Sequence, residues 1–364
     1  MTGRDISLLF VSPSNPISDA IACIDRSGRI SIALVVDANR HLLNTISDGD
    51  VRRGILAGCS LADPISRLLE IKASTPYPVP VTAPLETDSA QLLKLMQLRS
   101  VRQLPLVDGN GVVVDIVILG DFLPQAVESF QAIVMAGGRG MRLRPLTEST
   151  PKPLLPVGGK PVMEIIIGQL RDVGVRHIHI ATHYQAEKIM RHFGNGRSFG
   201  VDISYVEEEV PLGTGGALGL LKEPRESVLV INGDILTQVD FRSLHAFHKE
   251  HAADMTVGVR RYDIQVPYGV VSCRGARVRY LQEKPQLSLF VNAGIYLLEP
   301  SVFRLIPGNQ HLNITDLVSK LLQMKRPVVS YPICEYWLDI GQYEDYQKAQ
   351  EDVQNGKFQT HATY

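Results

Sequence analysis

Alternation between two kinds of segment constrains the second half of this chain most strongly. From residue 131 onward, short apolar runs typical of buried strands alternate with stretches that have the apolar spacing of amphipathic helices. The order predicts an α/β fold with a mainly parallel sheet and helices on both of its faces. Such sheets bind ligands at the carboxyl ends of their strands. The expected strands lie at 132–136, 175–182, 201–206, 228–232 and 255–260, and the clearest helices at 162–174 and 185–194.

The first half of the chain contains two similar passages, at residues 31–56 and 101–123. Each has an apolar strand ending in Val-Asp, a polar turn, a second apolar strand and an Asp that opens a helix. This repetition predicts a duplicated unit. We therefore expect two domains, at residues 1–127 and 129–364, as the length of 364 residues also favours.

Composition and charge exclude several classes of protein. The formal net charge is −1, so nothing predicts a nucleic-acid partner held by bulk electrostatics. The four cysteines are widely spaced, which favours a reduced cytosolic protein over a disulfide scaffold or a zinc site. No apolar stretch is long enough to span a bilayer, and the first ten residues make a poor signal peptide. We expect a cytoplasmic protein with no membrane partner.

A glycine-rich turn follows the first expected strand of the second half. Gly137, Gly138 and Gly140 leave backbone N–H groups free to approach anionic oxygens closely, because glycine has no Cβ. Arg142 and Lys152 then supply nearby donors suited to phosphate. The turn lacks the Gly-Lys-Ser/Thr of a P-loop and the third glycine of a dinucleotide fingerprint.

The passage from 132 to 161 closely resembles the signature of sugar-1-phosphate nucleotidyltransferases, and mannose-1-phosphate guanylyltransferases in particular. That signature reads Gly-Gly-x-Gly-x-Arg-Leu, then Pro-Leu-Thr, then Pro-Lys; Met141 stands where the family usually has Thr or Ser. The resemblance extends over 131–350. It implies a Rossmann-like nucleotide-diphospho-sugar transferase fold that transfers a nucleoside monophosphate from an NTP to a sugar 1-phosphate and releases pyrophosphate.

The resemblance also implies where the nucleotide binds. Its phosphates would lie on Ala136, Gly137, Gly138 and Gly140, and its base on Glu208, Gly213 and Gly216. An acidic acceptor suits guanine, which offers two adjacent donors, so GTP is favoured. Uracil could use the same acceptor through N3–H, so uridylyl or cytidylyl transfer stays open, as does a non-catalytic relative that only binds nucleotide-sugars.

Two aspartates predict a metal site. Asp234 ends an apolar strand, where a carboxylate is well placed to hold Mg²⁺. The resemblance gives Asp339 as the second ligand. It also implies that Arg142, Lys152 and Lys284 neutralise the charge that develops during transfer.

The sugar pocket follows from the same resemblance. Glu283 would bind sugar hydroxyls and Lys284 the sugar phosphate, while Gly269 and Asn292 would contact the sugar or the ribose.

The repeated passages of the first half resemble a pair of CBS domains, a small α/β module. In that family a hydroxyl residue and an Asp three positions later face a nucleotide ribose, which here implies Ser47 and Asp50. Ile118 replaces the hydroxyl in the second copy, so we expect one adenine-nucleotide site per chain, with helix capping as the alternative role for Asp50. Because CBS pairs often dimerise, a homo-oligomer is expected. A CBS pair ahead of a transferase resembles enzymes of bacterial surface-sugar pathways, glucosamine-1-phosphate guanylyltransferases of nonulosonic acid synthesis among them.

Three histidines, His245, His248 and His251, recur at helical spacing. They lie beside Lys249 and Glu250 without a ligand-type acid pattern, so a solvated helix face is favoured over a metal site.

Overall fold

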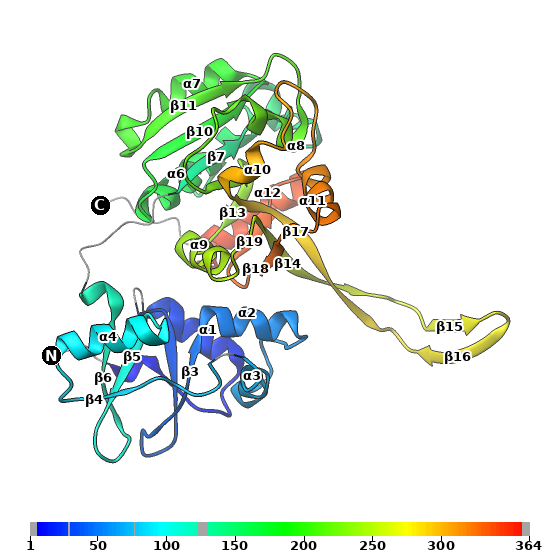
Figure 1. Cartoon of the computed structure of the whole chain (residues 1–364). Helices are drawn as coiled ribbons and strands as arrows, with labels where there is room; N and C mark the ends of the chain where they lie inside the picture. The colour runs from blue at the N-terminus through cyan, green and yellow to red at the C-terminus, as the bar shows by residue number, and fades with distance from the viewer. Residues whose placement is uncertain (1–5, 28–29, 76, 123–129, 359–364) are drawn as a thin grey trace. The chain divides into compact units, whose positions relative to one another are not determined.

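The computed structural model describes residues 6–27, 30–75, 77–122 and 130–358 (Figure 1). The chain divides into two compact units, residues 1–127 and 128–364. The expected domain boundary at 127–129 lies outside the described residues, as do residues 1–5 and 359–364. No helix in the described parts of the chain is long and apolar enough to cross a membrane.

The first unit contains two three-stranded sheets of the same topology. In each sheet a short first strand runs parallel to the middle strand, which forms an antiparallel hairpin with the third. This repeated order confirms the expected pair of small α/β modules. The strands are β1 (Phe10–Val11), β2 (Ile32–Val36) and β3 (Leu42–Ser47), then β4 (Ala83–Pro84), β5 (Gln103–Val107) and β6 (Val113–Ile118). The helices are α1 (Ile17–Arg26), α2 (Asp48–Leu56), α3 (Ile65–Lys72) and α4 (Ser89–Arg99).

A seven-stranded sheet forms the centre of the second unit, in the order β11-β10-β7-β12-β17-β14-β18. Every neighbouring pair is parallel except the two that include β17, which confirms the expected mainly parallel α/β sheet. The strands are β7 (Gln131–Met135), β10 (His177–Thr182), β11 (Asp202–Glu207), β12 (Val228–Asn232), β14 (Met255–Gln265), β17 (Gln286–Leu298) and β18 (Val328–Pro332).

Helices cover both faces of this sheet. Ala132 and Val134 of β7 face one core, and Ile133 faces the other; all three are fully buried. Burial on both faces explains why β7 is a continuous apolar run rather than an alternating one. The first core is covered by α6 (Val162–Asp172), α7 (Ala186–Phe193), α9 (Phe241–Glu250) and α12 (Tyr343–Gln354), and the second by α10 (Pro300–Phe303) and α11 (Ile314–Gln323).

Two smaller pairs of strands lie outside the main sheet of the second unit. Strands β13 (Ile235–Thr237) and β19 (Trp337–Asp339) pair with each other beside the main sheet. Strands β14 and β17 continue past the sheet as a ribbon that ends in the hairpin of β15 (Val270–Arg274) and β16 (Arg277–Gln282). This ribbon and its hairpin, residues 261–291, are called the β-arm; they project from the body of the unit (Figure 1).

The histidines of α9 do not form the expected solvated face. His245 and His248 are buried, because this side of α9 packs on the sheet. The two ring nitrogens of His248 lie 2.7 Å from Oγ1 of Thr256 and 3.0 Å from Oε1 of Glu299. Burial lowers the pKa of His248, although the bond to Glu299 opposes the shift.

Stability should therefore depend on the charge of His248. A lowered pKa favours the neutral ring in the folded state, so the stabilisation is present above about pH 6.5 and is lost as the pH falls below it. We predict that the unfolding free energy of the wild type falls more steeply between about pH 7.5 and about pH 5.5 than that of His248→Asn, measured by urea denaturation. His177→Gln, a change at an exposed histidine, should keep the wild-type slope. Parallel slopes for wild type and His248→Asn would contradict the assignment.

Candidate active site

A pocket opens at the carboxyl ends of β7 and β12. Strand β7 has β10 on one side and β12 on the other, so the connections leave it in opposite directions and the crevice lies at a topological switch point. The pocket is lined by Met135, Ala136, Gly137, Gly138, Lys152, Pro153, Glu208, Pro211, Gly213, Thr214, Asn232, Asp234 and Asn313. Seven of the sequence-predicted site residues are therefore together, from Ala136 to Asp234.

The loop after β7 turns sharply to bring Lys152 to the pocket. Gly140 has a φ of +61°, which favours glycine, and a Cβ there would meet the Thr147 side chain at 2.9 Å and Cβ of Lys152 at 3.2 Å. The hydroxyl of Thr147 donates to the Gly140 carbonyl at 2.7 Å and fixes the turn. Gly140 thus shapes the loop without lining the pocket.

The two predicted metal ligands are neighbours. Ile235 pairs with Asp339 across the β13–β19 ladder, and the Ile340 N–H donates to the Asp234 carbonyl at 3.1 Å. Burial raises the pKa of Asp339, and the charge of Asp234 raises it further. Lys152 and Arg142 oppose this shift, so both cations act on the carboxylate pair; Arg142 itself is exposed on the loop.

The carboxylate pair fits a divalent cation. Lys152 pairs with Oδ2 of Asp234, while Oδ1 is buried and has no hydrogen-bond partner among the described residues. A buried carboxylate oxygen without a donor is destabilising unless a cation or proton reaches it. No group of three or more His, Cys, Asp or Glu side chains suited to a metal occurs in the described ranges. Asp234 and Asp339 could therefore supply two oxygen ligands and leave the other positions to phosphate oxygens and water.

Glu208 lies opposite the glycine loop. Its Oε2 accepts from the Leu212 N–H at 2.7 Å, and its carbonyl lies 2.8 Å from Nδ1 of His183. A Cβ on Gly137 would come within 2.9 Å of Oε1, so this second oxygen lies directly against the glycine loop. Glu208 is buried and can offer one carboxylate oxygen to a ligand while the other holds the chain in place.

The glycine strip after Glu208 packs on a distant loop. Gly213 lines the pocket, and a Cβ there would meet the Leu312 carbonyl at 2.8 Å. Gly216 does not line it; a Cβ there would meet the Gln310 carbonyl at 2.5 Å, so close backbone packing explains this glycine. The same packing places Asn313 in the pocket lining, although the sequence did not indicate it as a site residue. Asn313 is the N-cap of α11, and a capping pattern alone indicates only where a helix starts.

The predicted sugar-binding residues are not all at the pocket. Asn292 lies where β17 leaves the sheet, and its Oδ1 accepts from the Gly294 N–H at 3.0 Å. A Cβ on Gly294 would meet Nδ2 of the pocket residue Asn232 at 2.6 Å, so Asn292 is close to the pocket edge.

Gly269, Glu283 and Lys284 lie instead on the β-arm and do not line the pocket. Within a single chain these three residues therefore lie apart from Lys152. The physical reason is the β14–β17 ladder, which stays paired as far as Gln265 and Gln286 and carries these residues outward.

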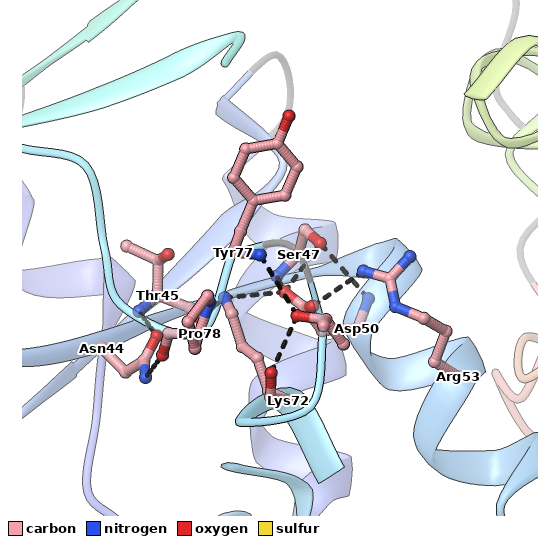
Figure 2. Close-up of polar contacts among 9 residues, drawn as sticks. Asn44, Thr45, Ser47, Asp50, Arg53, Lys72, Tyr77 and Pro78 are labelled. Carbon is pink, nitrogen blue, oxygen red and sulfur yellow. Dashed lines mark hydrogen bonds and ion pairs between the residues drawn. The ribbon is translucent and has the colours of Figure 1, made fainter. Parts of the chain in front are cut away.

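Asp50 of the first unit is fully partnered (Figure 2). Ser47 donates to its Oδ2 from both N and Oγ at 2.9 Å, and the Asp50 N–H donates back to Oγ of Ser47 at 3.2 Å, which completes a capping box at the start of α2. Lys72 donates to the same oxygen at 3.0 Å and Arg53 to Oδ1 at 2.8 Å. Burial alone would raise the pKa of Asp50, but Lys72 and the Ser47 N–H hold it below its usual range.

CBS domains bind adenine nucleotides. In this chain Asp50 already has a structural role, and a ribose would have to compete with Lys72 and Arg53 for it. The capping role that the sequence left open is therefore present.

Comparisons with known proteins identify the families of both units. The Nucleotidyl transferase family model matches residues 131–356, and the CBS domain model matches 4–57 and 74–127. Mannose-1-phosphate guanylyltransferase of Mycobacterium tuberculosis is 33% identical over 239 residues, which cover 64% of this chain and 66% of that protein. D-glycero-alpha-D-manno-heptose 1-phosphate guanylyltransferase of Aneurinibacillus thermoaerophilus is 34% identical over 229 residues, 62% of this chain and 99% of that protein.

Among solved structures, a Bacillus anthracis protein assigned as a glucose-1-phosphate thymidylyltransferase matches with a TM-score of 0.51 and 26% identity, over 65% of this chain and 97% of that one. The chain belongs to the nucleotidyl transferase family, with a CBS pair ahead of the transferase domain. Enzymes of this family that act on sugar 1-phosphates generally use a divalent metal.

The Lys72–Asp50 pair should stabilise the first unit. Both side chains are about 95% buried. Lys72→Met removes one of the two cations that contact the Asp50 carboxylate and leaves Arg53 as the other, so it should cost about 3 kcal/mol of local stability. Hydrogen exchange of the α2 amides measures this separately from the second unit. Arg67→Met, which breaks the more exposed Arg67–Asp63 pair, should cost less than about 1 kcal/mol. Equal protection losses in the two variants would contradict the role given to Lys72.

Proposed function

We propose that the protein transfers a nucleoside monophosphate from an NTP, with GTP preferred, to a sugar 1-phosphate, and that the nucleotide-sugar serves bacterial surface-glycan synthesis. The observation that carries this proposal is the convergence of Lys152, Asp234 and Asp339 beside the glycine loop at the switch point of the sheet. The pocket offers the backbone N–H groups of a glycine loop, the Lys152 ammonium group and carboxylates that could hold a divalent cation, a combination that suits a triphosphate.

The reaction needs positioning and charge neutralisation more than covalent chemistry. An oxygen of the sugar phosphate attacks the α-phosphorus, the bond from that phosphorus to the α–β bridging oxygen breaks in line, and pyrophosphate leaves with the electron pair. The backbone N–H groups of Gly137 and Gly138 bind phosphate oxygens, and Lys152 and Arg142 neutralise the charge on the leaving group. Mg²⁺, held by Asp234 and Asp339, would add Lewis-acid stabilisation of the phosphate oxygens.

The base preference rests on Glu208. Its Oε1 faces the glycine loop and can accept from guanine N1–H or the amino group, while Oε2 stays on the Leu212 N–H. The guanylyltransferase names of the two curated relatives support the same choice. Uridylyl or cytidylyl transfer is the alternative, since uracil N3–H can also donate to a single oxygen.

The direct test of the proposal is a grid of four NTPs against mannose, heptose, glucose and glucosamine 1-phosphates, followed by pyrophosphate release. Turnover with at least one pair, highest with GTP, is expected. No turnover with any pair would refute nucleotidyl transfer and favour a non-catalytic protein that binds nucleotide-sugars.

The carboxylate pair should be essential for turnover. We predict that Asp234→Asn and Asp339→Asn each lower kcat by at least ~10²-fold, because each variant loses one charged ligand while its size is preserved. Asp240→Asn, a change at the N-cap of α9, is the matched control and should retain most of the activity. Either ligand variant retaining near-normal rates at limiting Mg²⁺ would contradict the metal assignment.

The choice of base should depend on Glu208. Glu208→Ala should weaken the preference for GTP over the other NTPs by roughly 1–3 kcal/mol, because donors on guanine lose their acceptor. Inosine triphosphate, which lacks the amino group, should be a poorer substrate than GTP for the wild type. Glu207→Ala, at the exposed neighbouring acid, should leave the preference unchanged. A wild-type preference for UTP, CTP or dTTP would refute this prediction and leave nucleotidyl transfer intact.

A further inference from the structure

The β-arm has one apolar face that is largely exposed among the described residues of the second unit. Tyr262 pairs with Leu289 and Ile264 with Leu287, and cross-strand partners at alternate positions share one face of the ribbon. These four side chains are 56%, 53%, 40% and 48% exposed, respectively. At the tip, Val271 pairs with Leu281 and Ser272 pairs with Tyr280, and the side chains of Val271, Leu281 and Tyr280 are exposed.

The opposite face of the ribbon mixes polar and apolar side chains, since Phe290, which pairs with Arg261, is 44% exposed there. Arg261 donates to Asp263 at 3.2 Å and to Ser288 at 2.9 Å, and Ser288 donates to Asp263 at 2.5 Å. The β-arm therefore exposes apolar side chains to solvent, chiefly on the face that carries Tyr262 and Leu289. A two-stranded ribbon is at best marginally stable alone in water, so this apolar face requires a partner surface.

The pocket lacks the groups that the β-arm carries. Among the described residues that line it, Lys152 is the one cationic side chain, and it is paired with Asp234. A second phosphate, that of the sugar, needs a further cation. Lys284 and Glu283 offer a cation and a hydroxyl acceptor, and they lie beside Gly269, whose added Cβ would be 3.0 Å from Oε2 of Glu283.

The β-arm does not deliver these residues to its own pocket while its ladder is intact. From Asn292, near the pocket edge, to Gln286, the strand covers six residues of continuous pairing, about 20 Å at about 3.3 Å per residue. Lys284 lies further out again, where Gln265 donates to its carbonyl at 2.5 Å. Returning Lys284 to the pocket of its own chain would break the pairing between β14 and β17.

We propose that the β-arm lies on the second unit of another copy of this chain and places Glu283 and Lys284 at that copy's pocket, where they bind the sugar 1-phosphate. A second copy is the occupant because each copy has both the pocket that lacks these groups and the arm that carries them. Reciprocal exchange about a two-fold axis satisfies both pockets and covers both apolar faces at once. The inference rests on the proposed transferase function, which supplies the sugar phosphate.

Complementation between two defective chains tests the exchange. Full-length chains with different tags, one carrying Asp234→Asn and the other Lys284→Ala, are co-expressed and the doubly tagged dimer is purified. Exchange pairs the intact arm of the first chain with the intact pocket of the second, so the mixed dimer should have about half the wild-type rate, while each homodimer stays at least ~10²-fold below it. Arg279→Ala, which removes another exposed cation of the β-arm, should need no complementation. A mixed dimer as inactive as its parents would show that the arm acts on its own chain and would overturn the proposal.

The mass of the protein in solution gives a second readout that needs no activity. Leu289→Glu places a charge on the apolar face and should shift the dimer toward monomer in sedimentation equilibrium. Leu322→Glu, at an equally exposed leucine of α11, is the control and should remain dimeric. A monomeric wild type, or a Leu289→Glu variant as dimeric as the control, would overturn the exchange. Loss of the dimer in Leu289→Glu alone would support it even if no substrate pair turns over, an outcome that refutes only the transferase function.

Discussion

The β13–β19 ladder sets the condition on which the rest of the site depends. By pairing Ile235 with Asp339 it holds two carboxylates side by side at the edge of the sheet, where burial and the charge of Asp234 raise the pKa of Asp339. Such a pair is stable only if cations are supplied. The glycine loop after β7 supplies Lys152 and Arg142, and the unpartnered oxygen of Asp234 leaves room for one more. The need to neutralise these two carboxylates therefore links the β13–β19 pairing to the cations that can bind phosphate.

Features that depend on neighbours in sequence could be predicted. The strands and helices of the second unit follow from apolar period, and the position of Asp234 follows from an apolar strand that ends at Asn232. The glycine loop is equally local, since its turn depends on Gly140 and Thr147 within a few residues. Asp339 was accessible only through family resemblance, because the pairing that brings it to Asp234 joins segments far apart in the chain.

Features that depend on tertiary partners were not accessible. The polar neighbours of the α9 histidines predicted a solvated helix face, but His248 is buried and forms hydrogen bonds with Thr256 and Glu299. Asp50 was expected to bind a ribose or to cap a helix, and neither expectation included its ion pair with Lys72, which lies on a different helix. The strand expected at 255–260 is shorter than β14, so the sequence did not reveal the ladder that continues through Tyr262 and Ile264, their exposed side chains, or that this ladder holds Lys284 away from the pocket.

Nucleotidyl transfer at this pocket requires that an oxygen of the sugar phosphate become the bridge to the α-phosphorus. Sugar 1-phosphate carrying heavy oxygen at every phosphate position, incubated with GTP and followed by phosphorus NMR, reads this directly. The bridging oxygen of the nucleotide-sugar should be heavy, with an isotope shift on both of its phosphorus signals, and the released pyrophosphate should be unlabelled. A light bridging oxygen, or label in the pyrophosphate, would contradict attack at the α-phosphorus by the sugar phosphate.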